Sequence, residues 1–180
     1  MELTSYLLLA VGILGYVDIL LYHAISHGIR SHVDSREELI VHSLRGPTYA
    51  TLFVIVPNFT LHGLYFWVLV GVFVFDIAVS IVDFAIEGKS RKFLGGLPPG
   101  EYVLHMLIAM LFGGLVVSFA VSCHGWAHAA TAIDYAPAGV PAIIRLGMAI
   151  MAAFVLYSGF LDARAAVRLG QIRTSTASDS

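Results

Sequence analysis

Eight of the histidine and acidic residues in this sequence form four pairs, and the two members of each pair are four residues apart. The pairs are His23 with His27, Glu38 with His42, Asp83 with Glu87, and Glu101 with His105. Residues four apart lie on one face of an α-helix, so each pair can offer two ligand atoms to one metal ion. Imidazole and carboxylate ligands together suit iron, manganese or zinc, and the lack of a thiolate nearby argues against copper(I). The pattern predicts a metal centre.

Further polar residues extend the same helix faces. Tyr16 precedes His23, Arg45 and Tyr49 follow His42, and Asp76 precedes Asp83. We expect Tyr16, Arg45, Tyr49 and Asp76 to orient the ligands or to carry protons. A second and weaker group of histidines comprises His62, His124 and His128. Because Trp126 lies among them, we interpret these histidines first as anchors at a membrane interface.

Some of these carboxylates have simpler structural explanations. Glu38 stands three residues after Ser35, which is the spacing of a capping box at a helix start. Glu101 opens a helix, where a negative charge interacts favourably with the helix dipole, and Glu87 suits an interface. His42 and His105 have no such alternative, because they lie a turn or more inside apolar segments.

The segments that carry these residues are long and apolar. Of the 180 residues 58% are hydrophobic and only 12% are charged, about half the charged share of a soluble domain. Five segments reach the roughly 20 residues needed to cross a bilayer, at residues 6–27, 37–56, 64–86, 101–122 and 141–161. The sequence therefore predicts an all-α polytopic membrane protein, with a bundle of four helices and a fifth beside it. Residues 1–173 form a single domain, and residues 174–180 a disordered cytoplasmic tail.

The distribution of basic residues predicts the orientation. Five spans place nine of the ten lysines and arginines on the face that the C-terminus reaches, and only Arg145 on the other. Positive charge concentrates on the cytoplasmic side, so we expect the N-terminus outside and the C-terminus in the cytoplasm, in a bacterial plasma membrane. The net charge of −2 gives no basic surface for nucleic acid.

Alternating helix directions bring the four ligand pairs to one level. The first and third helices end where the second and fourth begin, so all eight side chains fall within about two helical turns, or roughly 10 Å. Carboxylates at membrane depth require cations, and Arg30 and Arg45 can neutralise at most two of them. A pair of divalent metal ions accounts for the remainder.

The leading functional hypothesis is a membrane oxidoreductase with two iron ions, although zinc or manganese would also suit the ligands. Its substrate is expected to be a quinone or another lipid-soluble molecule, with electrons from a donor protein or a larger membrane complex. The ligand inventory resembles that of water-soluble di-iron bundles, which use a Glu-x-x-His spacing instead. Three alternatives stay open. They are a haem b protein that pairs His23 with His105 or His42, an ion or proton transporter using Asp76, Asp83 and His42, and an accessory subunit without chemistry.

Overall fold

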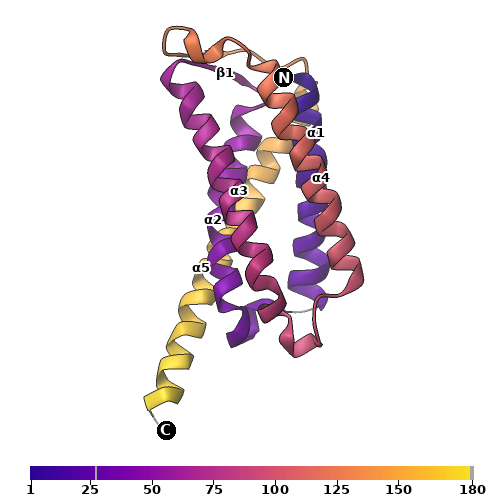
Figure 1. Cartoon of the computed structure of the whole chain (residues 1–180), viewed down its shortest axis with the longest axis vertical. Helices are drawn as coiled ribbons and strands as arrows, with labels where there is room; N and C mark the ends of the chain where they lie inside the picture. The colour runs from indigo at the N-terminus through magenta and orange to yellow at the C-terminus, as the bar shows by residue number, and fades with distance from the viewer. Residues whose placement is uncertain (27, 179–180) are drawn as a thin grey trace.

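The computed structural model describes residues 1–26 and 28–178, and the side chains of these residues other than 24–26, 94 and 173–178. Five long helices of this part of the chain run alternately up and down the long axis (Figure 1). They are α1 (Glu2–Asp18), α2 (Arg36–Ile55), α3 (Leu64–Ser90), α4 (Pro99–Ser122) and α5 (Ala142–Ser178). The two chain termini lie at opposite ends of the bundle, which we call its N-terminal end and its C-terminal end.

Four of these helices are long and apolar enough to cross a membrane. These candidate spans are Glu2–His23, Leu64–Ser90, Pro99–Ser122 and Ala142–Ile172. The predicted second span does form a helix of 20 residues, α2, but its first three turns carry charged residues that lower its hydropathy. The mostly helical architecture is confirmed, while the apolar character expected of all five segments holds for four.

The end of α5 differs from the prediction. The helix continues to Ser178, so residues 174–178 are helical rather than a disordered tail. No proline follows Pro141 in the sequence, so no proline interrupts this helix.

The connections at the two ends differ in kind. At the C-terminal end, α1 passes directly into a π-helix, η1 (Ile19–Ser26), and two short 3₁₀ turns, η2 (Ile29–Ser31) and η3 (Val33–Ser35), lead to α2. The turn η4 (Lys92–Leu94) joins α3 to α4 there. At the N-terminal end, β1 (Phe59–His62) pairs antiparallel with β2 (Ala132–Tyr135), and η5 (Trp126–His128) lies beside them.

Two glycines allow α2 and α5 to pack closely. A Cβ atom added to Gly159 would lie 3.3 Å from the Cα of Gly46, and one added to Gly46 would lie 3.1 Å from the carbonyl oxygen of Val155. Small residues at a helix–helix contact are typical of packing within membranes, where backbones approach without large side chains between them.

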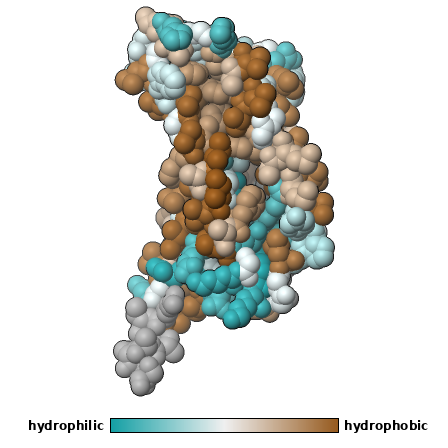
Figure 2. All heavy atoms as spheres, in the orientation of Figure 1, coloured by the Kyte–Doolittle hydropathy of each residue, from teal (hydrophilic) through white to brown (hydrophobic). Residues whose placement is uncertain are grey.

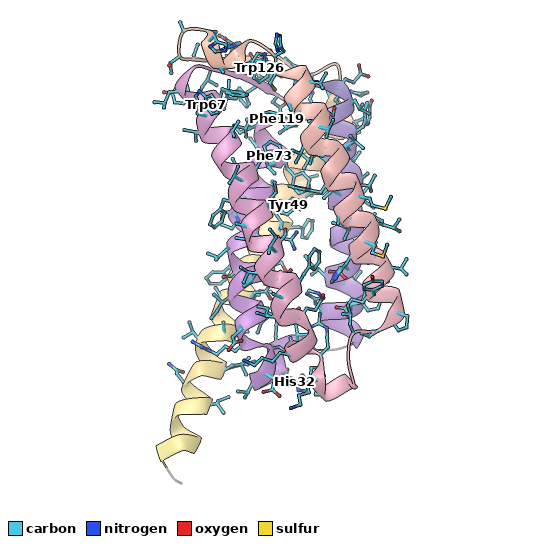
Figure 3. The ribbon with its side chains drawn as sticks, viewed as in Figure 1. His32, Tyr49, Trp67, Phe73, Phe119 and Trp126 are labelled. Atoms are coloured by element: carbon cyan, nitrogen blue, oxygen red, sulfur yellow. The ribbon has the colours of Figure 1, made fainter. Side chains whose placement is uncertain are left out.

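An aromatic and aliphatic core fills the N-terminal half of the bundle. Tyr49, Phe73 and Phe119 point into the space between the helices (Figure 3), and the rings of Phe73 and Phe119 are 4.7 Å apart. The visible outer surface is also apolar over its middle, whereas hydrophilic residues gather at the C-terminal end between α3 and α4 (Figure 2). An apolar surface of this extent is typical of a protein that contacts lipid.

Candidate metal centre

Buried ionisable residues gather in the C-terminal half of the bundle, below the aromatic core. We call the following residues the polar cluster: Asp18, His23, Glu38, His42, Asp83, Glu87, Arg91, Glu101 and His105. All of them except His42 and His105 are less than 9% exposed, and those two are partly buried. The structure thus brings together seven of the eight predicted ligands; the eighth, His27, lies outside the described residues.

One part of the polar cluster is formed by the end of α1, by η1 and by the first turns of α4. Its four members, which we call the first ligand group, are Asp18, His23, Glu101 and His105, and one ligand atom from each lies within 4.8 Å of the others. Asp18 Oδ2 is 3.3 Å from His23 Nε2 and 3.2 Å from His105 Nε2. Two ligands at about 2.1 Å from one ion lie at most about 4.2 Å apart, so these separations suit a shared ion.

Asp18 was not predicted, and the π-helix explains why. In a regular α-helix, residues five apart point in directions that differ by about 140°. A π-helix has i→i+5 hydrogen bonds, which bring residues five apart onto the same side. The change from α1 to η1 directly after Asp18 therefore aligns this carboxylate with His23. The only signal in the sequence is an aspartate inside an apolar segment, where a charge is costly.

The other part of the polar cluster is formed by α2 and α3. We call Glu38, His42 and Asp83 the second ligand group. His42 Nε2 is 3.9 Å from Glu38 Oε1 and 3.3 Å from Asp83 Oδ2. The ring of His23 stacks on that of His42 with centroids 4.5 Å apart. His23, Glu38 and His42, rather than the three members of the second ligand group, each bring one donor atom within 4.8 Å of the others. His23 thus stands between the two ligand groups.

Arg91 lies at the centre of the carboxylates with its side chain fully buried. It donates hydrogen bonds to Glu38 Oε2 at 2.6 Å and to both carboxylate oxygens of Glu101. Burial by itself lowers the pKa of the Arg91 guanidinium, but the hydrogen bonds that it donates to Glu101 and Glu38 raise this pKa overall, so that Arg91 stays charged. Sequence reasoning counted Arg91 only as a cation of the α3–α4 loop, because nothing in the sequence shows that the loop folds back into the bundle.

The predicted supporting residues divide into two sets. Arg45 connects Asp76 and Tyr49 to the polar cluster, because its guanidinium lies 3.1 Å from Asp83 Oδ2, 3.8 Å from Asp76 Oδ1 and 3.3 Å from the Tyr49 hydroxyl. Tyr16, by contrast, is 51% exposed, and its ring is 6.5 Å from that of Phe154. Its expected alignment with His23 assumed α-helical steps, which the π-helix interrupts.

The capping explanation of Glu38 is not what the structure shows. Ser35 is the N-cap of α2, but its side chain makes no capping hydrogen bond and instead donates to the Ser90 carbonyl at 3.4 Å. Glu38 is engaged by Arg91. Glu87 also belongs to the polar cluster rather than to an interface, because its Oε1 is 3.1 Å from His105 Nδ1.

The histidines at the N-terminal end do not form a comparable site. His62 Nε2 lies 3.6 Å from Asp134 Oδ2, and its ring is 5.5 Å from that of Trp126. His124 and His128 are exposed. Within the part of the chain that the structure describes, none of these three histidines belongs to a potential metal-ligand group.

The charge of the polar cluster and its surroundings fits divalent cations. The polar cluster and the neighbouring Asp76 together carry six carboxylates among the described residues, and the positive charges of Arg45 and Arg91 balance two of them. Asp162 lies nearby but is paired with Arg30 at 2.6 Å. With neutral histidines, four negative charges are left, which is the charge that two divalent ions neutralise. Asp18 Oδ1 and Asp83 Oδ1 are buried and make no hydrogen bond to any described residue, so each ligand group retains an oxygen for an ion.

The arrangement can therefore bind metal ions through nitrogen and oxygen atoms from four helices. Comparison with protein-family models, with curated proteins and with solved structures finds no match for the chain.

Proposed function

We propose that this protein is an integral membrane metalloprotein that holds two divalent metal ions in the polar cluster. The proposed metal is iron, and the proposed activity is oxidation and reduction of a lipid-soluble molecule such as a quinone. Mixed imidazole and carboxylate ligation supports iron, and it suits manganese and zinc as well. Bound iron would supply one-electron chemistry close to the apolar layer.

The observation that carries the proposal is the excess of carboxylates over arginines in and beside the polar cluster. A buried carboxylate without a compensating partner is strongly destabilising. Two divalent ions would balance the four negative charges, and the unbonded oxygens of Asp18 and Asp83 would serve as ligands. The first ligand group would hold one ion, and Glu38 and His42 of the second ligand group would bind the other, while Arg91 and Arg45 orient the neighbouring carboxylates.

The proposed location is a bacterial plasma membrane, with the C-terminal end of the bundle in the cytoplasm. Four apolar helices of sufficient length support insertion. Arg145, the one basic residue assigned to the outside, bonds to Asn58 and Tyr135 beside the β1–β2 pair, at the end opposite to the polar cluster. In this orientation, the metal centre lies at the cytoplasmic boundary, within reach of a soluble electron donor.

A second candidate is a non-catalytic subunit of a membrane complex, in which ion pairs alone hold the polar cluster. Arg91 favours this candidate because its guanidinium already neutralises parts of Glu38 and Glu101. Protonation of three histidines and one carboxyl group would then balance the remaining charge.

The haem and transporter hypotheses have less support. Two imidazoles that bind one haem iron stand on opposite faces of the macrocycle, whereas the rings of His23 and His42 stack on each other. For a transporter, a polar path would have to continue from Asp76 toward the N-terminal end. That direction is filled by Phe73 and Phe112, whose rings are 6.2 Å apart.

Metal analysis of the detergent-purified protein, combined with an absorption spectrum, tests the proposal. We expect about two iron ions per chain and no Soret band. A Soret band would select the haem hypothesis. Protein that contains no metal after purification and binds none on addition of Fe²⁺, Mn²⁺ or Zn²⁺ would instead support the ion-pair network.

A further inference from the structure

We infer that Arg91 and a metal ion compete for the same ligand atoms, so that metal binding withdraws the Arg91 guanidinium and loosens the α3–α4 connection, residues 91–98. This inference rests on the proposed function, because it concerns how an ion enters the first ligand group. It adds a device that makes metal binding detectable at the C-terminal end of the bundle.

The Arg91 guanidinium contacts two of the four residues of the first ligand group, and it does so at their candidate ligand atoms. Its Nε lies 3.1 Å from Glu101 Oε1 and 3.3 Å from Glu101 Oε2, and its Nη2 also donates to Glu101 Oε1. Nη2 lies 3.3 Å from His23 Nε2 as well. An arginine nitrogen can only donate, so a hydrogen bond between these two atoms uses the lone pair that His23 Nε2 would give to a metal ion.

A divalent ion and the guanidinium cannot share these atoms. An ion about 2.1 Å from His23 Nε2 along the direction of that lone pair would overlap Arg91 Nη2, which is only 3.3 Å from the ring nitrogen. Two positive charges at such a separation also repel each other strongly where water is scarce. The guanidinium must therefore leave His23 and release Glu101 before both can serve as ligands.

The contact between Arg91 and Glu38 can persist when an ion binds. Arg91 Nη1 bonds to Glu38 Oε2 at 2.6 Å, whereas Glu38 Oε1 lies 3.9 Å from Nε2 of His23 and 3.9 Å from Nε2 of His42. The guanidinium can thus turn away from Glu101 about its bond to Glu38, and it continues to orient the Glu38 carboxylate.

This withdrawal affects the α3–α4 connection, because Arg91 anchors the connection in the bundle. Among the described side chains of residues 91–98, only that of Arg91 is buried. Its bond to Glu101 joins the start of the connection to the first turn of α4. Loss of this bond removes the tie between the two ends of the connection, and local opening of residues 91–98 becomes easier.

Arg91→Met distinguishes competition from support. If Arg91 competes with the ion, its removal should tighten Co²⁺ binding about tenfold or more, because charge-assisted hydrogen bonds no longer have to be broken. If Arg91 supports the ion, the same change should weaken binding. Titration of the purified full-length protein, followed by the absorption bands of Co²⁺, measures the dissociation constant. Lys89→Met removes an exposed cation two residues away and is the matched control, which should bind Co²⁺ as the native protein does.

Hydrogen exchange of the native protein tests the inference without any substitution, and it decides the matter if Arg91→Met does not fold. Co²⁺ should speed the exchange of the backbone amides of residues 92–97 several-fold, because their connection opens more often. A ligand that stabilises the folded state ordinarily slows exchange, so the sign of the change is diagnostic.

The outcomes separate this inference from the proposed function. Weaker Co²⁺ binding by Arg91→Met, or unchanged or slower exchange of residues 92–97 with Co²⁺ bound, would overturn the inference and leave the metal centre in place. Failure of the native and variant proteins alike to bind Co²⁺ would reject the proposed function, and the inference with it. Binding by Arg91→Met alone would support the competition and reject a resident metal in the native protein.

Discussion

Arg91 lies 2.6 Å from Glu38, although the two residues are 53 positions apart and neither side chain is more than 1% exposed. Arg91 directly follows α3, and Glu38 lies in the first turns of α2, so this ion pair ties the α3–α4 connection to the interior of the bundle. The same guanidinium reaches Glu101 of α4. One cation thus joins carboxylates of two helices.

Replacing Arg91 by methionine should therefore destabilise the metal-free protein strongly. The change leaves Glu38 and Glu101 buried without their shared cation, and breaking a buried ion pair typically costs about 3–5 kcal/mol. Added metal should restore part of this stability, because a divalent ion replaces the lost positive charge. Denaturant unfolding in detergent, followed by circular dichroism with and without metal, measures both effects.

Lys89→Met is the matched control for that measurement. Lys89 pairs with Glu37 at 2.8 Å, two residues before Arg91, but both side chains are largely exposed. Loss of this ion pair should change the free energy of unfolding little. Equal destabilisation by the two substitutions would contradict the central role of Arg91.

Close packing of α2 on α5 predicts a position-dependent effect of alanine. Gly→Ala within a helix normally stabilises it by up to about 1 kcal/mol. Gly147→Ala in α5 should show this gain, because no atom lies within 4 Å of the added carbon. Gly46→Ala should instead be neutral or destabilising, since the new Cβ meets the Val155 carbonyl oxygen at 3.1 Å. Comparison of the two unfolding midpoints decides the matter, and equal gains would show that α2 and α5 are separated more widely.

Helical periodicity and alternating helix direction were sufficient to predict that His23, Glu38, His42, Asp83, Glu87, Glu101 and His105 meet in one layer. These properties follow from the regular geometry of helices, which the spacing of polar residues reveals.

The residues that were missed depend on irregular geometry. Asp18 joins the polar cluster only because of the π-helix η1, and the side chain of Arg91 enters the bundle from a loop. Tyr16 was misplaced for the same reason as Asp18, because the irregular turn changes its register with His23. Hydrophobic patterns carry no information about such local departures from α-helical geometry.

Cysteine labelling tests the predicted orientation in the membrane. Native Cys123 should not interfere, because it is 3% exposed and burial raises the pKa of its thiol to about 12, so that little reactive thiolate forms at neutral pH. In intact cells, an impermeant maleimide should label Ala130→Cys and leave Lys92→Cys unlabelled until the membrane is disrupted. The reverse pattern would show an inverted orientation, and labelling of both positions in intact cells would show that α4 does not cross the membrane, which contradicts the five-span arrangement.

Conservative substitutions of Glu38 and Glu101 separate metal ligation from a purely structural role. Glu→Gln retains the size of the side chain and a hydrogen-bond acceptor for Arg91, but it removes the negative charge that an ion requires. We expect Glu38→Gln and Glu101→Gln to lower the iron content sharply, as His42→Ala and His105→Ala should, because each ligand group then lacks a donor. Helical content, measured by circular dichroism, should hold in all four variants. Full metal content in both glutamine variants, with loss in the histidine variants, would show that Arg91 and the two glutamates form a structural ion-pair network beside the metal. Retention in all four would leave no role for the polar cluster in metal binding, and the protein would then be a non-catalytic subunit.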